Sequence, residues 1–203
     1  MDPDLAGSTE LVPGESRRSA LKADRRRQLL QAGAALIAAR GYQGVRLEDL
    51  GAAVGISGPA VYRYFANKEA VLAELLVGVS DRLITGGQAV VVAATSPARA
   101  LTGLIEFHLD FAFGEPELIR IQDRDLASLP EGALHRVRQA QRTYVELWVV
   151  VLCAVRPGLV ADDARVQAHA VFGLINSTPY SAKGAVPERS REILRAMALA
   201  ALA

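Results

Sequence analysis

Apolar residues recur every three or four positions along most of the chain, a spacing that places them on one face of an α-helix. The segment from Arg17 to Arg40 shows this pattern, and Gly41 follows it where a helix commonly ends. The same pattern predicts helices over 47–54, 59–65, 68–83 or beyond, 97–113, 115–126, 131–155, 161–177 and 187–202. A break is expected at Thr85-Gly86-Gly87, and no segment alternates as a β-strand would. We therefore predict an all-α protein of about nine helices.

Two short helices meet at a tight turn between residues 54 and 58. Gly55 ends the first helix and Ser57 can cap the second. Pro59 suits the first helical turn, because the N–H that proline lacks would have no partner there. Two helices joined in this way form a helix-turn-helix, whose second helix can enter the major groove of DNA.

Composition and charge sharpen this interpretation. Of 203 residues, 51% are hydrophobic and 5% aromatic, and the abundance of Ala and Leu favours helices. Residues 1–16, rich in Pro, Gly, Ser and acidic residues, are predicted to be a disordered tail. The net charge is +1, yet residues 15–68 hold ten Lys/Arg against four Asp/Glu. Such a basic block is expected where one part of a protein meets a polyanion, although a solvated basic face has the same composition.

The second helix of the helix-turn-helix combines small residues with side chains suited to DNA. Its first residues, Gly58, Pro59 and Ala60, leave so little bulk that the backbone could approach the bases. Val61 and Phe65 are four residues apart and are expected to be buried. The candidate groove and backbone contacts on the remaining faces are Tyr62, Arg63, Tyr64 and Lys68. Tyrosines on a short helix can also be packing residues, which leaves a structural role open.

The run GYQGVRLEDLGAAVGISGPAVYRYFANKEAVLAELL, residues 41–76, closely resembles the N-terminal DNA-binding domain of TetR-type transcriptional regulators. The family usually has Ser or Thr where this chain has Arg46, which removes a helix cap and offers a side chain to a phosphate. The resemblance implies phosphate contact from Tyr62 and Lys68. With the Ser57 turn included, it implies base or groove contact from Ser57, Gly58, Pro59, Ala60, Arg63 and Tyr64.

The same resemblance implies an organisation for the whole chain. It assigns residues 17–68 to a helix-turn-helix domain and residues 69–203 to an effector-binding and dimerisation domain. In such proteins the last two helices pair in a homodimer that binds a palindromic double-stranded DNA operator. The apolar stripes over 161–177 and 187–202 suit this pairing, although packing within one chain would give the same pattern.

Most of the remaining aromatic residues lie in the middle of the chain, with polar residues among them. Ligand pockets are mainly apolar with a few placed polar groups, although aromatic residues at helical spacing more often form a core. The candidate ligand-binding residues are Phe107, His108, Phe111, Gln122, Tyr144, Trp148, Phe172 and Asn176.

Two later segments suggest the chemistry of the effector. IRIQDRDLASLPEGALHRVRQAQRTYVELW and FGLINSTPYS are similar to an actinobacterial branch of TetR-type proteins associated with fatty-acid or branched-chain acyl-CoA catabolism. This similarity suggests an acyl-CoA or other lipid-like effector. A cationic entry for it could use Arg120, Arg124, Arg136 and Arg138, unless these residues form a solvated helix face.

The sequence disfavours several other functions. Cys153 is the only cysteine, which excludes an intramolecular disulfide, and the three histidines are too scattered to suggest a metal site. No P-loop, HExxH or GxSxG motif occurs, so we expect neither an enzyme nor a cofactor. Without a signal segment or an apolar run of roughly 18 residues, we expect a cytoplasmic protein with no membrane partner.

The sequence therefore predicts a ligand-responsive repressor. The effector would favour a spacing of the two recognition helices that no longer fits half-sites roughly 34–36 Å apart. The alternatives are a helical interaction module without specific DNA binding and, less favoured, an enzyme that acts on acyl thioesters.

Overall fold

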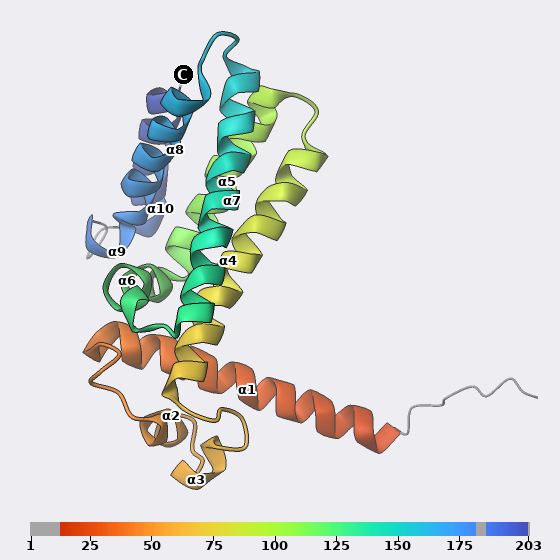
Figure 1. Ribbon diagram of the computed structural model, residues 1–203, viewed down its shortest axis with the longest axis vertical. Helices are drawn as coiled ribbons and strands as arrows, with labels where there is room; N and C mark the ends of the chain where they lie inside the picture. Colours follow the sequence, from red (N-terminus) through yellow and green to blue (C-terminus); the bar gives the residue numbers. More distant parts are fainter. Residues whose placement is uncertain (1–12, 182–185, 203) are drawn as a thin grey trace, which may run out of the picture.

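The computed structural model describes residues 13–181 and 186–202 of the chain. Over these residues the chain forms ten α-helices, one 3-10 helix and no β-strand (Figure 1). The helices are α1 (Pro13–Arg40), α2 (Leu47–Ala53), α3 (Gly58–Val61), α4 (Lys68–Ala93), α5 (Pro97–Gly114), α6 (Pro116–Asp125), η1 (Leu126–Ser128), α7 (Glu131–Val155), α8 (Ala161–Asn176), α9 (Thr178–Ser181) and α10 (Pro187–Leu202). The all-α prediction is confirmed, and the additional helix α9 is a single turn after α8.

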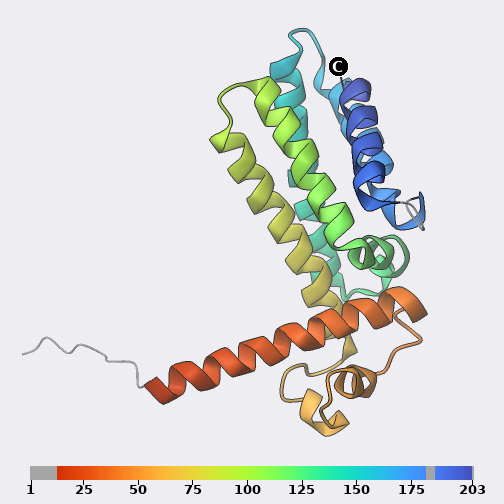
Figure 2. The ribbon, with the colours of Figure 1, turned by 180° about the vertical axis from the view of Figure 1, so that it is seen from behind.

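Two hydrophobic cores are joined by α4 and α6. The smaller core lies where α1, α2 and α3 meet the N-terminal end of α4, and the larger core fills the bundle of α5, α7, α8 and α10. Figure 2 shows α1 running across the end of this bundle, with α2 and α3 on its far side. Helix α6 gives Leu118 and Ile121 to the smaller core and Ile119 to the larger one. A shift of α6 would therefore disturb both cores.

Helix α1 begins earlier than its spacing predicts. It starts at Pro13 rather than Arg17, so residues 13–16 belong to the helix and not to the predicted tail. Proline is tolerated there because the first-turn N–H groups of a helix have no intrahelical partner. Residues 1–12 lie outside the described residues. At the other end Gly41 has a φ of +81° and donates its N–H to the Ile37 carbonyl at 2.8 Å, which confirms the predicted end of the helix.

The predicted break at Thr85-Gly86-Gly87 is wrong, because α4 continues through it to Ala93. A Cβ at Gly86 would overlap the ring of Phe107 on α5. A Cβ at Gly87 would lie 2.8 Å from Cε2 of Tyr144 on α7. The two glycines allow close approach between helices, and this packing outweighs the roughly 1 kcal/mol that each glycine costs a helix relative to alanine.

Helix α4 bears on the expectation that the protein has no membrane partner. By length and composition alone its 26 residues meet the requirements for spanning a bilayer. A core helix of a soluble protein meets the same requirements, and α4 packs against α5 and α7 along much of its length. These contacts account for part of its apolar character, since 28% of its most apolar stretch is buried.

Candidate nucleic-acid interface and internal cavity

Helix α2, residues 54–57 and α3 form a helix-turn-helix. Its turn depends on Gly55, which has a φ of +72° that other residues rarely adopt. The N–H of Ile56 closes the turn by donating to the Gly51 carbonyl at 2.9 Å. Val61 and Phe65 are buried in the smaller core, as predicted. The opposite side of α3 is therefore left at the surface.

The surface side of α3 carries several of the predicted DNA contacts. Ser57 begins the helix through its backbone but makes no side-chain capping bond, so its hydroxyl is not used within the turn. Pro59 occupies the first turn as predicted and is exposed, whereas Gly58 and Ala60 are half-buried. Arg63 is exposed, and its side chain makes no hydrogen bond or ion pair with any described residue. Its guanidinium is available to an external partner.

Two arginines of the basic block hold the helix-turn-helix together instead of facing outward. Arg26 forms an ion pair with Glu74 on α4 and donates to the carbonyl of Tyr64. Arg25 donates to the C-cap carbonyl of α2, that of Val54, at 3.2 Å. Tyr64 is half-buried against the smaller core. The structure thus gives Tyr64 a packing role, and it assigns part of the positive charge to stabilising the domain.

A shallow groove of about 300 Å³ gathers three of the predicted phosphate contacts, Arg46, Tyr62 and Lys68. The Tyr62 hydroxyl donates to Oε1 of Glu48 at 2.8 Å. The Lys68 ammonium donates to the backbone carbonyl of Tyr42 at 2.9 Å and lies 4.3 Å from the centre of the Tyr42 ring. Two of the three side chains are therefore already held in position within the protein.

The ends of the neighbouring helices explain why the groove keeps its shape. The side chain of Asn67 accepts from the N–H of Ala70 at 2.8 Å, so Asn67 caps α4 as predicted. At the start of α2 the Arg46 N–H donates to Oδ2 of Asp49 at 2.9 Å. Because Asp49 reaches back in this way, α2 keeps half of a capping box without Ser or Thr at position 46. The Arg46 side chain stays exposed.

An internal cavity of about 280 Å³ lies between α4, α5, α6, α7 and α8. Six of the eight predicted ligand-binding residues line it, namely His108, Phe111, Gln122, Tyr144, Phe172 and Asn176. Its remaining lining residues are Ser80, Leu83, Ile119, Ala140, Gln141, Val145 and His169. None of these thirteen residues is Lys, Arg, Asp or Glu. The cavity therefore suits a neutral, largely apolar group.

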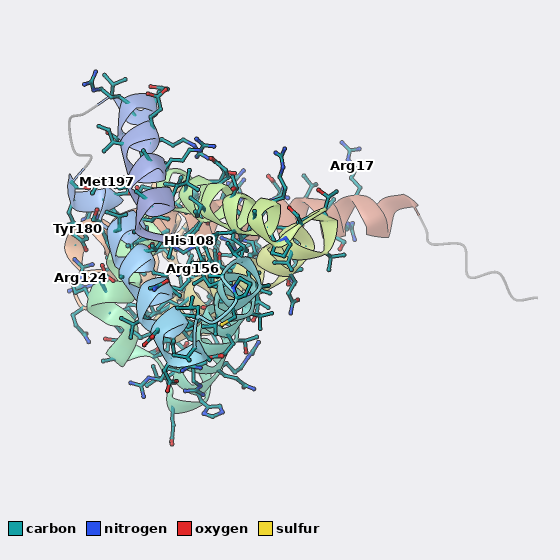
Figure 3. All side chains as sticks on the ribbon, turned by 90° about the horizontal axis from the view of Figure 1, so that it is seen from above. Arg17, His108, Arg124, Arg156, Tyr180 and Met197 are labelled. Carbon is teal, nitrogen blue, oxygen red and sulfur yellow. The ribbon has the colours of Figure 1, made fainter. Side chains whose placement is uncertain are left out.

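A hydrogen-bonded row crosses this cavity. His108, labelled inside the bundle in Figure 3, lies 3.1 Å through Nε2 from Oδ1 of Asn176 and 3.3 Å through Nδ1 from the Tyr144 hydroxyl. Burial lowers the pKa of His108 to about 4, so the imidazole is neutral at pH 7. Its Nε2–H then donates to Asn176, and Nδ1 accepts from Tyr144, whose pKa burial raises. The Asn176 carbonyl is used by the protein, which leaves its NH₂ group for a ligand acceptor.

The two other predicted pocket residues lie outside this cavity. Trp148 is fully buried behind it, with its ring 4.9 Å from that of Phe172. Phe107 lines an adjoining cavity of about 470 Å³, which shares Leu83 and Phe111 with the first. Leu83 and Phe111 therefore lie between the two cavities.

The four arginines proposed for a cationic entry do not line the internal cavity. Arg120 donates to the Pro179 carbonyl at 2.9 Å, and Arg136 lies 3.7 Å from Asp81. Arg124 donates to a carbonyl of α1, and Arg138 is exposed on α7. A larger groove of about 570 Å³ between α1, α4 and the start of α6 has five charged lining residues and no aromatic ring. The internal cavity is the better candidate for an effector site because its lining matches that of typical ligand pockets.

Helix α6 joins the cavity to the helix-turn-helix. Gln122 lines the cavity, and two residues further along the helix Arg124 donates to the carbonyl of Ile37 at 2.5 Å, near the end of α1. The buried carboxylate of Asp125 accepts from Arg124 at 2.9 Å and from the N–H of Tyr42 at 3.3 Å. This junction could not be predicted from the sequence, because residues about 85 positions apart give no local signal.

Comparisons with known proteins agree with this geometry. Residues 29–75 match the family described as "Bacterial regulatory proteins, tetR family", and residues 94–202 match "Tetracyclin repressor-like, C-terminal domain". The chain is similar to the HTH-type transcriptional repressor KstR2 of Mycolicibacterium smegmatis, with 29% identity over 133 residues. That match spans 64% of this chain and 64% of the relative, just under two thirds of its length.

Solved structures share the fold along most of the chain. A TetR-family transcriptional regulator from Bordetella parapertussis has a TM-score of 0.73 and 26% identity, covering 83% of this chain and 93% of that chain. AibR in complex with isovaleryl coenzyme A and operator DNA has a TM-score of 0.71 and 19% identity. The match covers 85% of this chain and 97% of the AibR chain. At that identity, AibR supports the fold alone.

Proposed function

Because the chain belongs to the TetR family of bacterial regulatory proteins, we propose that it is a transcriptional repressor that a small hydrophobic or acyl-CoA-like effector releases from its operator. The observation that carries this proposal is the surface of α3. There Arg63 is free of partners within the described chain, beside a helix start made of Gly58, Pro59 and Ala60. An unpaired arginine can bind guanine in the major groove with two hydrogen bonds.

We assign the predicted contacts to two tasks. Ser57, Gly58, Pro59, Ala60 and Arg63 would face the bases, with Tyr64 packed behind them. Arg46, Tyr62 and Lys68 would meet the phosphates from their shared groove. Phosphate contacts fix the position of the protein on the duplex, and base contacts read its sequence. Residues 17–68 would bind DNA and residues 69–203 would bind the effector and form the dimer.

The internal cavity supports an effector with a neutral, apolar end. At about 280 Å³ it is near the lower limit of typical ligand pockets, and its lining holds no Lys, Arg, Asp or Glu. A short acyl chain with its thioester carbonyl would suit these groups, and the Asn176 NH₂ could donate to that carbonyl. The phosphates of coenzyme A would have to lie outside, since the lining offers no cation. The acyl coenzyme A bound to AibR makes this class the first to test.

The effector signal would pass through α6. A ligand beside Gln122 would shift α6, and Arg124 and Asp125 at its end contact the end of α1 and the backbone of Tyr42. The junction would then turn the helix-turn-helix relative to the bundle. In a dimer this rotation would change the spacing of the two α3 helices, which must match half-sites roughly 34–36 Å apart.

A homodimer would form through α8 and α10. Leu194, Ala198 and Leu202 on α10 are buried within the chain. On the same two helices Val166, Ile193 and Met197 are exposed by 69%, 49% and 49%. Exposed apolar residues on these two helices are the kind of surface that a dimer contact would cover. A cytoplasmic location and the lack of enzymatic activity would follow from this role.

Fluorescence anisotropy with DNA from upstream of the protein's own gene tests this function. We expect tight binding that resists unrelated competitor DNA and weakens steeply with salt. Arg63→Ala should weaken binding and relax sequence preference, whereas the matched control Arg138→Ala, on the exposed side of α7, should leave both unchanged. If wild-type protein bound both DNAs equally and Arg63→Ala changed nothing, a helical interaction module would be the better description.

A further inference from the structure

One acidic side chain lies among the predicted DNA contacts, where it holds the hydroxyl of Tyr62. Glu48 is exposed on α2, in the groove that also holds Arg46, Tyr62 and Lys68. A carboxylate at such a place repels phosphates, so it weakens DNA binding unless it serves another purpose. Glu48 therefore needs an explanation other than affinity.

Three contacts fix the side chain of Glu48 beside the start of α3. Its Oε1 accepts the hydroxyl hydrogen of Tyr62 at 2.8 Å. Its Cγ would lie only 2.8 Å from a Cβ at Gly58, so the stem of Glu48 fills the space that the missing side chain leaves. Bonds from its own backbone N–H and from Tyr62 lower the pKa of Glu48, so the carboxylate is charged at neutral pH. A charged acceptor is thereby held next to the residues expected to face the bases.

We propose that Glu48 is a specificity-determining residue that reads cytosine in the operator. In the major groove the cytosine N4 amino group is a donor that a glutamate can accept from, whereas thymine presents O4, an acceptor that a carboxylate repels. The bond from Tyr62 takes one of the roughly four acceptor positions of an ionised carboxylate, so Glu48 can still accept from a base. Glu48 thus lowers affinity for DNA in general and restores it at sites with a cytosine in this position.

Tyr62 is a positioning residue in this account. Its hydroxyl orients the carboxylate, and the same ring lies in the groove where a phosphate would come near. A phosphate that took the hydroxyl bond would compete with Glu48 for it. Through the hydrogen bond between Tyr62 and Glu48, recognition of one base therefore depends on the position of the neighbouring DNA phosphate.

The inference rests on the proposed DNA binding, and a selection from randomised double-stranded DNA separates the two. Wild-type protein, Glu48→Ala, Glu48→Gln and Tyr62→Phe would each be selected against the same library. We expect a cytosine in each half-site for wild type, which Glu48→Ala no longer selects. Glu48→Gln should move that preference to adenine, to which glutamine can bind with two hydrogen bonds. Tyr62→Phe should keep cytosine but with a weaker preference.

Affinity measurements complete the test. On the selected duplex, changing that cytosine to thymine should weaken wild type about tenfold and Glu48→Ala less than twofold. Glu48→Ala should also bind random DNA more tightly than wild type does. If all four proteins selected the same bases, Glu48 would not read DNA, although the proposed function would stand. If wild type selected no sequence at all, both proposals would fall.

Discussion

The buried His108 predicts a specific loss of stability in mild acid. Its imidazole is neutral in the folded protein, with a pKa of about 4 because of burial, against 6.5 in an unfolded chain. The unfolded chain therefore binds the proton first as the pH falls, and the folded state loses stability between pH 6.5 and pH 4. The full shift corresponds to about 3 kcal/mol, of which about 2 kcal/mol should appear between pH 7 and pH 5.

Urea denaturation at pH 7, 6 and 5 measures this loss. His108→Gln should remove most of the change in unfolding free energy, even if the variant is less stable at every pH. His135→Gln, a change at an exposed histidine of α7, should keep the wild-type dependence. Glu48, Glu106 and Glu146 have lowered pKa values, so the stability they contribute is lost only as the pH falls below about 4.5. Equal pH dependence in wild type and His108→Gln would show that His108 is not the source of the loss.

Three further predictions concern the fold, the junction and the dimer. Asp125→Ala should destabilise the protein by about 1–3 kcal/mol in urea denaturation, because it leaves the buried N–H of Tyr42 unpaired. An unchanged urea midpoint would mean that this junction does not stabilise the fold. Gly87→Ala should cost about 1–3 kcal/mol by overpacking against α7, whereas Gly78→Ala on the same helix, where the nearest atom is 3.9 Å away, should stabilise by up to about 1 kcal/mol. Met197→Glu should convert a dimer to monomers in sedimentation experiments, and Val92→Glu, at a site on α4 that is 86% exposed, should not.

Local patterns were enough to predict most of the fold. Apolar spacing and capping residues act over three to five positions, so the helices, the Gly55 turn and the Asn67 cap could be read directly. The continuity of α4 could not be predicted, because Gly86 and Gly87 pack closely against Phe107 and Tyr144, which lie on other helices. A glycine pair gives the same local signal at a loop and at a close helix contact.

The same limit explains the outcome for the candidate sites. Six of the candidate residues line one cavity because aromatic and polar groups gathered in the sequence also gather in the fold. Phe107 misses the internal cavity because it directly precedes His108 and so lies about 100° around the helix from it. The roles of Asp125 and Glu48 depend on Tyr42 and Tyr62, which are 83 and 14 positions away. An acidic residue in a basic block was the available signal for Glu48.

Footprinting of the purified protein on DNA from upstream of its own gene would show whether the protein binds an operator. We expect protection of a palindromic site with two half-sites one helical turn apart, about 10–10.5 base pairs from centre to centre, or a multiple of that spacing. Protection should weaken when an acyl thioester that binds the internal cavity is added. A footprint no stronger than on unrelated DNA, under conditions where Arg63→Ala behaves like wild type, would contradict the proposed operator binding.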